Sequence, residues 1–322
     1  MTYVSESLPP DRPNPQKRNI LIRQVAQLPW WLVLISLFVL WVYIAVNDNP
    51  RYELIWTGGM LGGVQAGIKT TLWVTFLAFT VATLMGLILA LLRRSRNPFV
   101  YHPTTAYVEF IRGIPTLVLV YFIVLAGVPK LLGYLNELGE WMIREDINLY
   151  LGFSVRNLFA DAKTRDIDDV YKAVAGLAIS YSAFISEVFR AGLNSVDKGQ
   201  IEAAKSLGMN RWQVTWLIVL PQAFRTVLPP LGNDFIALLK ESSLVSVVGV
   251  EEITRGGNKI GASRYLFFEA YTVIALTYLV LTLSLSLLVR LLEMYLNQHK
   301  EPQSGLFSGW RKIFRWGRWS SR

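Results

Sequence analysis

The chain contains long stretches without a charged residue, and their lengths fit membrane-spanning helices. Four such stretches are clear: residues 24–47, 70–92, 113–129 and 270–289. A helix of about 20 residues, rising roughly 1.5 Å per residue, crosses a hydrocarbon layer about 30 Å thick. Two further apolar segments carry a few charges, 173–193 and 226–248. The pattern therefore predicts an all-α integral membrane protein with about six transmembrane helices.

The first stretch, 24–47, has a second interpretation as a cleaved signal peptide. Its apolar body is longer than the roughly 7–15 residues of a signal-peptide core, and no small-residue cleavage pattern follows Val46. A long, mostly polar segment also precedes it. We therefore interpret this stretch as an additional N-terminal membrane anchor.

The chain carries a net charge of +9, and 52% of its residues are hydrophobic but only 17% are charged. A strongly basic chain can bind nucleic acid, but here the cations follow the loops. If the N-terminus is cytoplasmic, 20 of the 32 Lys and Arg residues fall in the segments on that side, 1–29, 93–112, 187–225 and 290–322. Because cytoplasmic loops are enriched in Lys and Arg, both termini are predicted to be cytoplasmic and no nucleic-acid partner is expected.

Two segments outside the predicted spans have a distinctive composition, one acidic and one basic and aromatic. The acidic segment 129–172 lies outside the cell in this topology, and its apolar and aromatic content predicts one or two short surface helices. The C-terminal segment 306–319 separates aromatic from basic side chains at helical spacing. This is typical of an amphipathic helix on anionic lipid headgroups, and the alternative is a disordered basic tail.

The residue types that several kinds of chemistry require are missing from the chain. It has no Cys and only two His, His102 and His299, which stand apart from other metal-ligating residues. It also lacks a phosphate-binding Gly-rich loop and the motifs of common hydrolases. We therefore expect no metal, no bound cofactor and no catalytic residue. The absence of these motifs is compatible with a channel, a secondary transporter or a subunit powered by another chain.

The predicted cytoplasmic loop 187–221 contains a short helix over residues 200–207. Its residues are good helix formers, a glycine precedes it, and Gly208 follows at the position where helices often end in a left-handed conformation. The small side chains of Ala203 and Ala204 would allow another protein to approach closely. Such a helix suits the groove of a partner, although it is equally a well-capped loop helix.

The same loop carries a recognisable spacing. Glu202-Ala203-Ala204 is followed by three residues and Gly208, then by nine residues, Ile218, one residue and Leu220-Pro221. This spacing resembles the EAA motif of bacterial ABC importer permeases. Three further blocks are similar to permeases of the histidine/glutamine type for polar amino acids: residues 112–115, 187–208 and 228–254. The resemblance covers about residues 62–292.

The resemblance implies a transport subunit that is driven by ATP hydrolysis in other chains. A dimer of ABC ATPases, holding ATP and Mg, would grip the EAA helix, and a soluble binding protein would deliver polar amino acids to a pair of permeases in a bacterial inner membrane. The residues implied in coupling to the ATPase are Gly199, Gln200, Glu202, Ala203, Ala204, Gly208 and Pro221.

Two features depart from the family pattern, in which permeases of this type usually have five spans and an external N-terminus. Here an extra span precedes the five-helix core, and the segment 129–172 is longer than in compact members. The longer segment resembles the general amino-acid branch, where two non-identical permeases pair. We expect an N-terminal tail and anchor (1–61), a permease domain (62–292) and a basic tail (293–322).

The predicted fifth span contains both helix breakers and charges. Pro229, Pro230 and Gly232 are expected to interrupt its helix, which a membrane tolerates only where protein or water satisfies the freed carbonyls. Charges beyond them must face the bundle interior or a wet cavity, because each costs about 2.5–3.5 kcal/mol at mid-bilayer. The candidates for the translocation path are Asn233, Asp234, Lys240 and Glu241. Alternatively, Asp234 is structural and caps the broken helix or pairs with Arg225 or Lys240.

Two charged pairs, each three residues apart, lie near the cytoplasmic ends of predicted spans. Glu187 and Arg190 either form an ion pair within a helix or contribute to a gate. Glu109 and Arg112, followed by Pro115, are similar to the family pattern in this region and are interpreted as helix-positioning residues.

Two functions of other classes remain as alternatives. A secondary transporter coupled to H⁺ or Na⁺ would be expected to repeat its spans, with intramembrane acids in both halves, whereas this sequence has one polar span. A membrane-anchored scaffold protein would have no use for such a span. The leading interpretation is the permease of an ATP-driven amino-acid importer.

Overall fold

The computed structural model describes residues 49–58, 62–145 and 167–297, together with the isolated residues 36, 37, 40, 160 and 164. The predicted N-terminal span, 24–47, lies outside the described residues except for three positions, and the predicted amphipathic tail, 306–319, lies wholly outside them. The chain divides into two compact units, residues 1–53 and 54–322. Of the smaller unit only a few positions are described, including the start of α3 (Pro50–Thr57), so the fold below is that of the larger unit.

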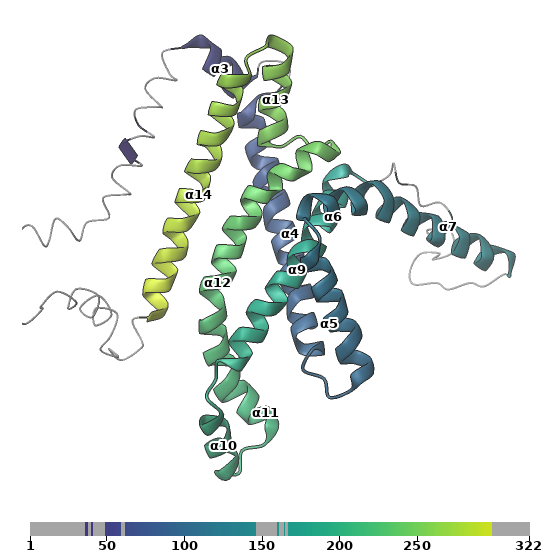
Figure 1. Cartoon of the computed structure of the whole chain (residues 1–322), viewed down its shortest axis with the longest axis vertical. Coiled ribbons are helices and arrows are strands. Elements are labelled where there is room, and N and C mark those ends of the chain that lie inside the picture. Colours follow the sequence, from purple (N-terminus) through teal and green to yellow (C-terminus); the bar gives the residue numbers. More distant parts are fainter. Residues whose placement is uncertain are drawn as a thin grey trace, which may run out of the picture. The chain divides into compact units, whose positions relative to one another are not determined.

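Five helices in the described part are long and apolar enough to cross a membrane, and they correspond to the second to sixth predicted spans. They are α4 (Val64–Leu92), α6–η2–α7 (Thr116–Phe122, Ile123–Gly127, Val128–Arg144), α9 (Asp169–Asn194), α11–η4–α12–η5 (Arg211–Val214, Thr215–Val219, Leu220–Glu241, Ser242–Val248) and α14 (Phe267–Asn297). Every element in the described part is helical, which confirms the all-α fold (Figure 1).

Three shorter helices connect these spans (Figure 1). Helix α5 (Pro98–Gly113) follows α4, α10 (Lys198–Ser206) follows α9, and α13 (Ile253–Arg264) lies between η5 and α14. The sequence pattern predicts only α10 among them. Helix α5 is not predicted because Pro103 and several charged or polar residues weaken its apolar signal, but Pro98 at its start and the Asn97 cap favour a helix there.

The centre of the bundle is the contact between α4 and α9, which pack along each other through small residues. Ala78 and Ala82 of α4 are fully buried against α9, in a cluster that includes Leu177 and Ile185. A Cβ atom on Gly86 would lie only 2.8 Å from Cγ2 of Ile185. Small residues of this kind let two helices approach closely in a membrane, where apolar surface alone gives no preference for protein over lipid.

A second tight junction joins the start of α4 to α13. Glu252 caps α13 by accepting a hydrogen bond from the Arg255 amide (2.9 Å), and its other carboxylate oxygen accepts one from the Tyr278 hydroxyl of α14 (2.7 Å). Its side chain is fully buried, and burial raises the pKa of this carboxyl although the hydrogen bonds oppose the shift. Gly67 of α4 packs directly on the backbone of Glu252 and Ile253.

Prolines shape two of the spans in the same way. A π-helical turn, η2 or η4, ends two residues before Pro129 and Pro221, respectively. The amides of Val128 and Leu220 bond to carbonyls five residues earlier. Because a proline ring clashes with the carbonyl four residues before it, the wider π turn lets the helix continue through each proline.

This arrangement corrects the expectation for the segment after the third span. The helix does not end at Pro129 but continues as α7 to Arg144. The predicted outer segment 129–172 therefore begins with one helix, α7, which follows η2 without an intervening loop. The physical reason is the π turn, which the apolar pattern does not reveal.

The expectation that Pro229, Pro230 and Gly232 interrupt the fifth span is wrong, because α12 continues through all three. The two prolines are adjacent, so only the two consecutive carbonyls four residues before them lose a backbone donor. Gly232 provides space rather than a break: a Cβ atom there would lie 2.8 Å from Cγ1 of Val289 in α14.

The junction between α4 and α13 predicts that Gly67→Ala destabilises the protein. The added Cβ would lie 2.3 Å from backbone atoms of Glu252 and Ile253, which cannot move aside as a side-chain end would. Overpacking of this kind typically costs about 1–3 kcal/mol, so we expect a lower Tm for the purified protein. Gly133→Ala is the matched control, since its Cβ would meet nothing within 4 Å. Equal Tm values for the two variants would contradict this packing.

Candidate functional site

Helix α10 is fixed at its start by its own loop. Asp197 caps it by accepting a hydrogen bond from the Gly199 amide at 2.6 Å. The predicted helix over 200–207 is thus confirmed, but it begins two residues earlier, at Lys198. Gly199 lies inside its first turn and not before it. Gln200 ties the helix to α12, since the Gln222 amide group donates to its side-chain oxygen (2.7 Å).

The end of α10 depends on Gly208. Its φ of +80° lies in the left-handed region, and its amide donates to the Lys205 carbonyl (2.9 Å). The Met209 amide then bonds back to the Ala204 carbonyl (3.1 Å). A residue with a Cβ is strained in this conformation, which explains why glycine stands where the chain turns toward α11.

The two alanines of the EAA sequence face different ways. Ala203 is exposed, together with Glu202. Ala204 is 3% exposed and packs against Val196 and Val214 beneath the helix. The expectation that both alanines receive an approaching protein is therefore wrong for Ala204, which sets how closely α10 sits on its own loop. Pro221, further along, is exposed at the start of α12.

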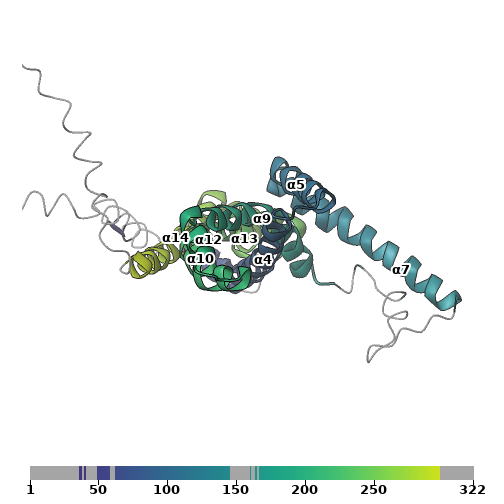
Figure 2. The same cartoon turned by 90° about the horizontal axis from the view of Figure 1, so that it is seen from below.

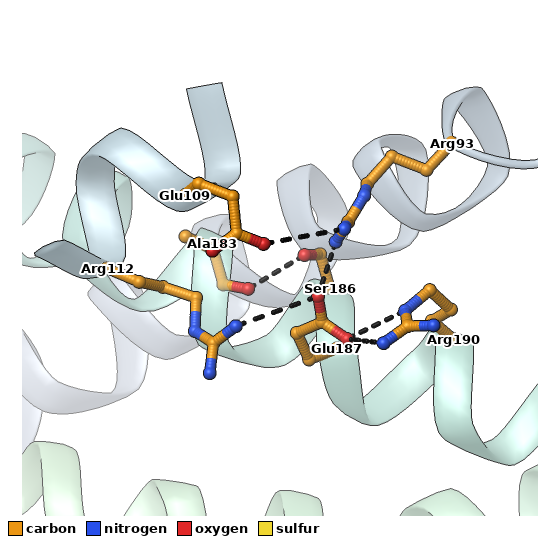
Figure 3. Close-up of polar contacts among 7 residues, drawn as sticks. All are labelled: Arg93, Glu109, Arg112, Ala183, Ser186, Glu187 and Arg190. Carbon is orange, nitrogen blue, oxygen red and sulfur yellow. Dashed lines mark hydrogen bonds and ion pairs between the residues drawn. The ribbon is translucent and has the colours of Figure 1, made fainter. Parts of the chain in front are cut away.

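Five charged side chains, from the end of α4, from α5 and from α9, meet at one place (Figure 3). Arg93 follows the last residue of α4, and the other four come from α5 and α9. Glu187 is the centre: one carboxylate oxygen accepts from Arg93 and lies 3.7 Å from Arg112, and the other accepts from Arg190 at 2.7 Å. Glu109 lies 3.8 Å from the second amino group of Arg93. We call this set the arginine cluster: Arg93, Glu109, Arg112, Glu187 and Arg190.

The arginine cluster contains the two charged pairs that the sequence singles out, Glu187 with Arg190 and Glu109 with Arg112. Glu187 and Arg190 do form the pair within α9. The cluster also contains one residue that the sequence does not single out. That residue is Arg93. Its side chain is only 8% exposed and is the most buried in the cluster. Its contact with Glu187 joins residues 94 positions apart, so no local spacing could reveal it.

Further contacts hold the cluster in place. The Arg112 guanidinium lies 5.7 Å from the centre of the Phe184 ring, within the range of a cation–π interaction. Pro115 caps α6 just after an extended Ile114, so it marks the break between α5 and the third span. The cluster therefore links α4, α5 and α9 into one unit.

A second polar group lies within the spans. Asp234 and Glu241 are half-buried on α12, and Tyr181 of α9 interacts electrostatically with both. One oxygen of each carboxylate, Oδ2 and Oε2, is buried with no hydrogen-bond partner among the described residues. Buried carboxylate oxygens are normally paired. Apart from Tyr181, which interacts with both acids, the described residues offer no donor to these two oxygens.

The other two polar residues of this span differ from Asp234 and Glu241 in their exposure. Asn233 and Lys240 are exposed on the surface of the single chain. No ion pair joins Asp234 to Arg225 or Lys240 within the described residues, so the structural pairing considered for Asp234 is not seen there. Within the same residues, no group of three or more His, Asp or Glu side chains is placed to hold a metal ion.

The arginine cluster predicts unequal costs for removing its members. Glu187→Gln leaves the buried Arg93 side chain without its main charged partner, and we expect a clear fall in Tm of the purified protein. The free-energy cost should stay below the roughly 3–5 kcal/mol typical of fully buried pairs, because Glu187 is partly exposed. Glu109→Gln is the control: its side chain is 62% exposed and its contact is long, so less than about 1 kcal/mol is expected. A larger effect for Glu109→Gln would contradict Glu187 as the centre.

Comparison with known proteins gives the same picture for most of the chain. Residues 82–297 match the family described as binding-protein-dependent transport system inner membrane component. The chain is 34% identical over 230 residues to the probable amino-acid permease protein YxeN of Bacillus subtilis (strain 168), covering 71% of this chain and 89% of that protein. It is 33% identical over 227 residues to the glutamine transport system permease protein GlnP of Escherichia coli (strain K12), covering 70% and 90%.

Two solved structures are also similar. The crystal structure of an amino acid ABC transporter with histidines aligns with a TM-score of 0.57 at 35% identity, over 72% of this chain and 93% of that one. The MetNI methionine ABC transporter, in an inward-facing conformation, aligns with a TM-score of 0.51 at 17% identity, over 76% and 98%, and shares the fold. In such transporters ATP is hydrolysed by a separate chain. The family match, the relatives and the five spans together place this chain among the binding-protein-dependent transport system inner membrane components, as a membrane-spanning permease subunit of an ABC importer and not an enzyme.

Proposed function

We propose that this permease carries polar amino acids across a bacterial inner membrane, with both termini in the cytoplasm. The relatives named above are amino-acid and glutamine permeases. The observation that carries the proposal is the pair of unpartnered carboxylate oxygens on Asp234 and Glu241. Every free amino acid has an ammonium group, and a carboxylate in a water-poor site is a strong acceptor for it. The distribution of Lys and Arg supports the orientation.

In this proposal Asp234 and Glu241, about two turns or roughly 10 Å apart along α12, contact the substrate's ammonium group one after the other. Tyr181 limits the space beside them from α9. Asn233 and Lys240, which are exposed on the single chain, lie where a second permease would complete the path. Exposed charge on a membrane span is costly, so a protein or aqueous neighbour suits Lys240 better than lipid.

As a member of this family, the chain works with an ATPase, a substrate-binding protein and a second permease. We infer more specifically that a dimer of ATPases, which binds ATP and Mg, grips α10, and that the second permease is a different chain. Glu202 and Ala203 form the exposed face that fits this role. Gly199, Gln200, Ala204, Gly208 and Pro221 then hold the helix in position. The permease domain would be 62–292, between the N-terminal anchor (1–61) and the basic tail (293–322).

The arginine cluster has a positioning role in this scheme. Its contacts join α4 and α5 to the helix that leads into the coupling loop. We therefore favour Glu109, Arg112, Pro115, Glu187 and Arg190 as residues that orient the helices around the coupling loop.

Removal of either acid on α12 tests the substrate assignment. In proteoliposomes containing the whole complex, Asp234→Asn and Glu241→Gln are expected to raise the KM for uptake of polar amino acids. A lost charged hydrogen bond of about 1.5–3 kcal/mol corresponds to roughly 10–100-fold. Glu140→Gln, an exposed acid on α7, is the control and should leave KM unchanged. Unaltered uptake kinetics in both α12 variants would remove these acids from the path.

The coupling role of α10 is tested by reversing one exposed charge. Glu202→Lys should leave the complex assembled, because the side chain is exposed and makes no ion pair within the described residues. We expect ATP hydrolysis stimulated by loaded binding protein to fall several-fold, since a cation on the ATPase would meet a like charge. Lys205→Glu, also exposed on α10, is the matched reversal on the same helix. If Glu202→Lys retains full stimulation, Glu202 does not contact the ATPase.

A further inference from the structure

The transport scheme above does not use helix α7 (Val128–Arg144). We propose that α7 is an interfacial helix that lies along the membrane surface on the side opposite α10, with one apolar face in the lipid. The proposal concerns how the chain meets the bilayer and does not depend on which substrate it carries.

One face of α7 is both apolar and exposed over its whole length. Leu131, Tyr134, Leu138 and Trp141 recur in steps of three and four residues, which places them on one side of the helix. Their side chains are 58%, 58%, 42% and 46% exposed, respectively. We call these four residues the apolar stripe. Tyr and Trp favour the boundary between hydrocarbon and water, so the stripe has the composition of an interfacial helix.

The charged residues of α7 avoid this stripe. At about 100° per residue, they fall in an adjacent arc that does not overlap it, and all four are exposed: Lys130, Glu137, Glu140 and Arg144. Two positive and two negative charges balance each other. An oppositely charged partner surface is therefore not indicated, and burial of apolar area is the available driving force.

The direction of α7 differs from that of the spanning helices. In Figure 1 it extends sideways from α4 and α12, and Figure 2, which looks along the long axis, shows it at full length. Its main packing contact in the described part is with η2, immediately before it. Since α4 and α12 cross the membrane, a helix that runs across them lies close to the membrane plane.

The chain also has a place to turn into that plane. Residues 116–129 contain no charge, and every charge of this long helix lies in α7. The π turn η2 and Pro129 stand at the transition, and such features are the usual causes of sharp helix bends. α7 therefore starts where an apolar segment ends. Helices α5 and α6 and the turn η2 pack in succession along α9, the helix that leads to α10, and α7 leaves them at the end remote from α10 (Figure 1).

Lipid explains the exposed stripe better than a protein partner does. Helix α7 extends away from α12 and α14 (Figure 2), and the proposed path residues that a second permease would share lie on α12. A partner on α7 would have to sit at a distance from that path. The bilayer, by contrast, necessarily surrounds the apolar segment from which α7 leaves.

The chain has no Cys, so a single introduced Cys provides a unique site for a nitroxide label. The whole complex, with cysteine-free partner subunits, would be reconstituted into phosphatidylcholine nanodiscs. Labels at Leu131→Cys, Tyr134→Cys and Leu138→Cys report on the stripe. The controls are Lys130→Cys, Glu137→Cys and Glu140→Cys. Electron paramagnetic resonance then measures collisions with O₂, which concentrates in lipid, and with a water-soluble nickel complex.

We expect the stripe labels to favour O₂ and the control labels to favour nickel, with all stripe labels at one shallow depth. Exclusion of both reagents from the stripe would show that a protein covers it and would overturn the proposal. So would free access of nickel to every position, or a depth that changes steadily from 131 to 138, as in a helix crossing the bilayer. Loss of amino-acid uptake by the Asp234 variant has no bearing on this pattern.

Discussion

The close contact between α4 and α9 is the interaction on which the rest of the structure depends. Gly86, Ala78 and Ala82 bring the two backbones together, and the positions of both polar groups follow from this. At one end of this contact, Arg93 forms its ion pair with Glu187. Further along α9, Tyr181 is held beside the two acids of α12. In a membrane this contact cannot rest on burial of apolar surface alone, so its shape must supply the preference.

The apolar runs and the EAA spacing predict much of the fold. Five spans and α10 occur where the sequence places them, because charge-free length and helix-capping residues are local properties. Contacts between distant positions are not local, which is why Arg93 is missed although it is the cation that binds Glu187 most directly. Helix α5 is missed for a related reason: it is neither apolar nor clearly amphipathic, and its packing on α9 is a tertiary effect.

The prolines illustrate where local rules fail in a membrane. Pro229 and Pro230 are strong helix breakers in water, where a freed carbonyl can bond to solvent. In a span no such solvent is available, and leaving the helical conformation would expose still more unsatisfied groups. The chain therefore keeps α12 helical through the proline pair. At Pro129 and Pro221 the preceding turn widens instead. The sequence alone does not distinguish these two responses.

The attachment of α10 has a mechanical consequence. Ala204 seats it on the loop that follows α9, and Gln200 links it to Gln222 near the start of α12. From Gln222 to Glu241 the helix rises about 30 Å. A displacement of α10 would thus move one end of a stiff helix that carries Asp234 in its second half and Glu241 at its other end. Because the Ala204 side chain is short, α10 packs closely on this loop. Even a small displacement of α10 would therefore displace the part of α12 that lies in the middle of the membrane.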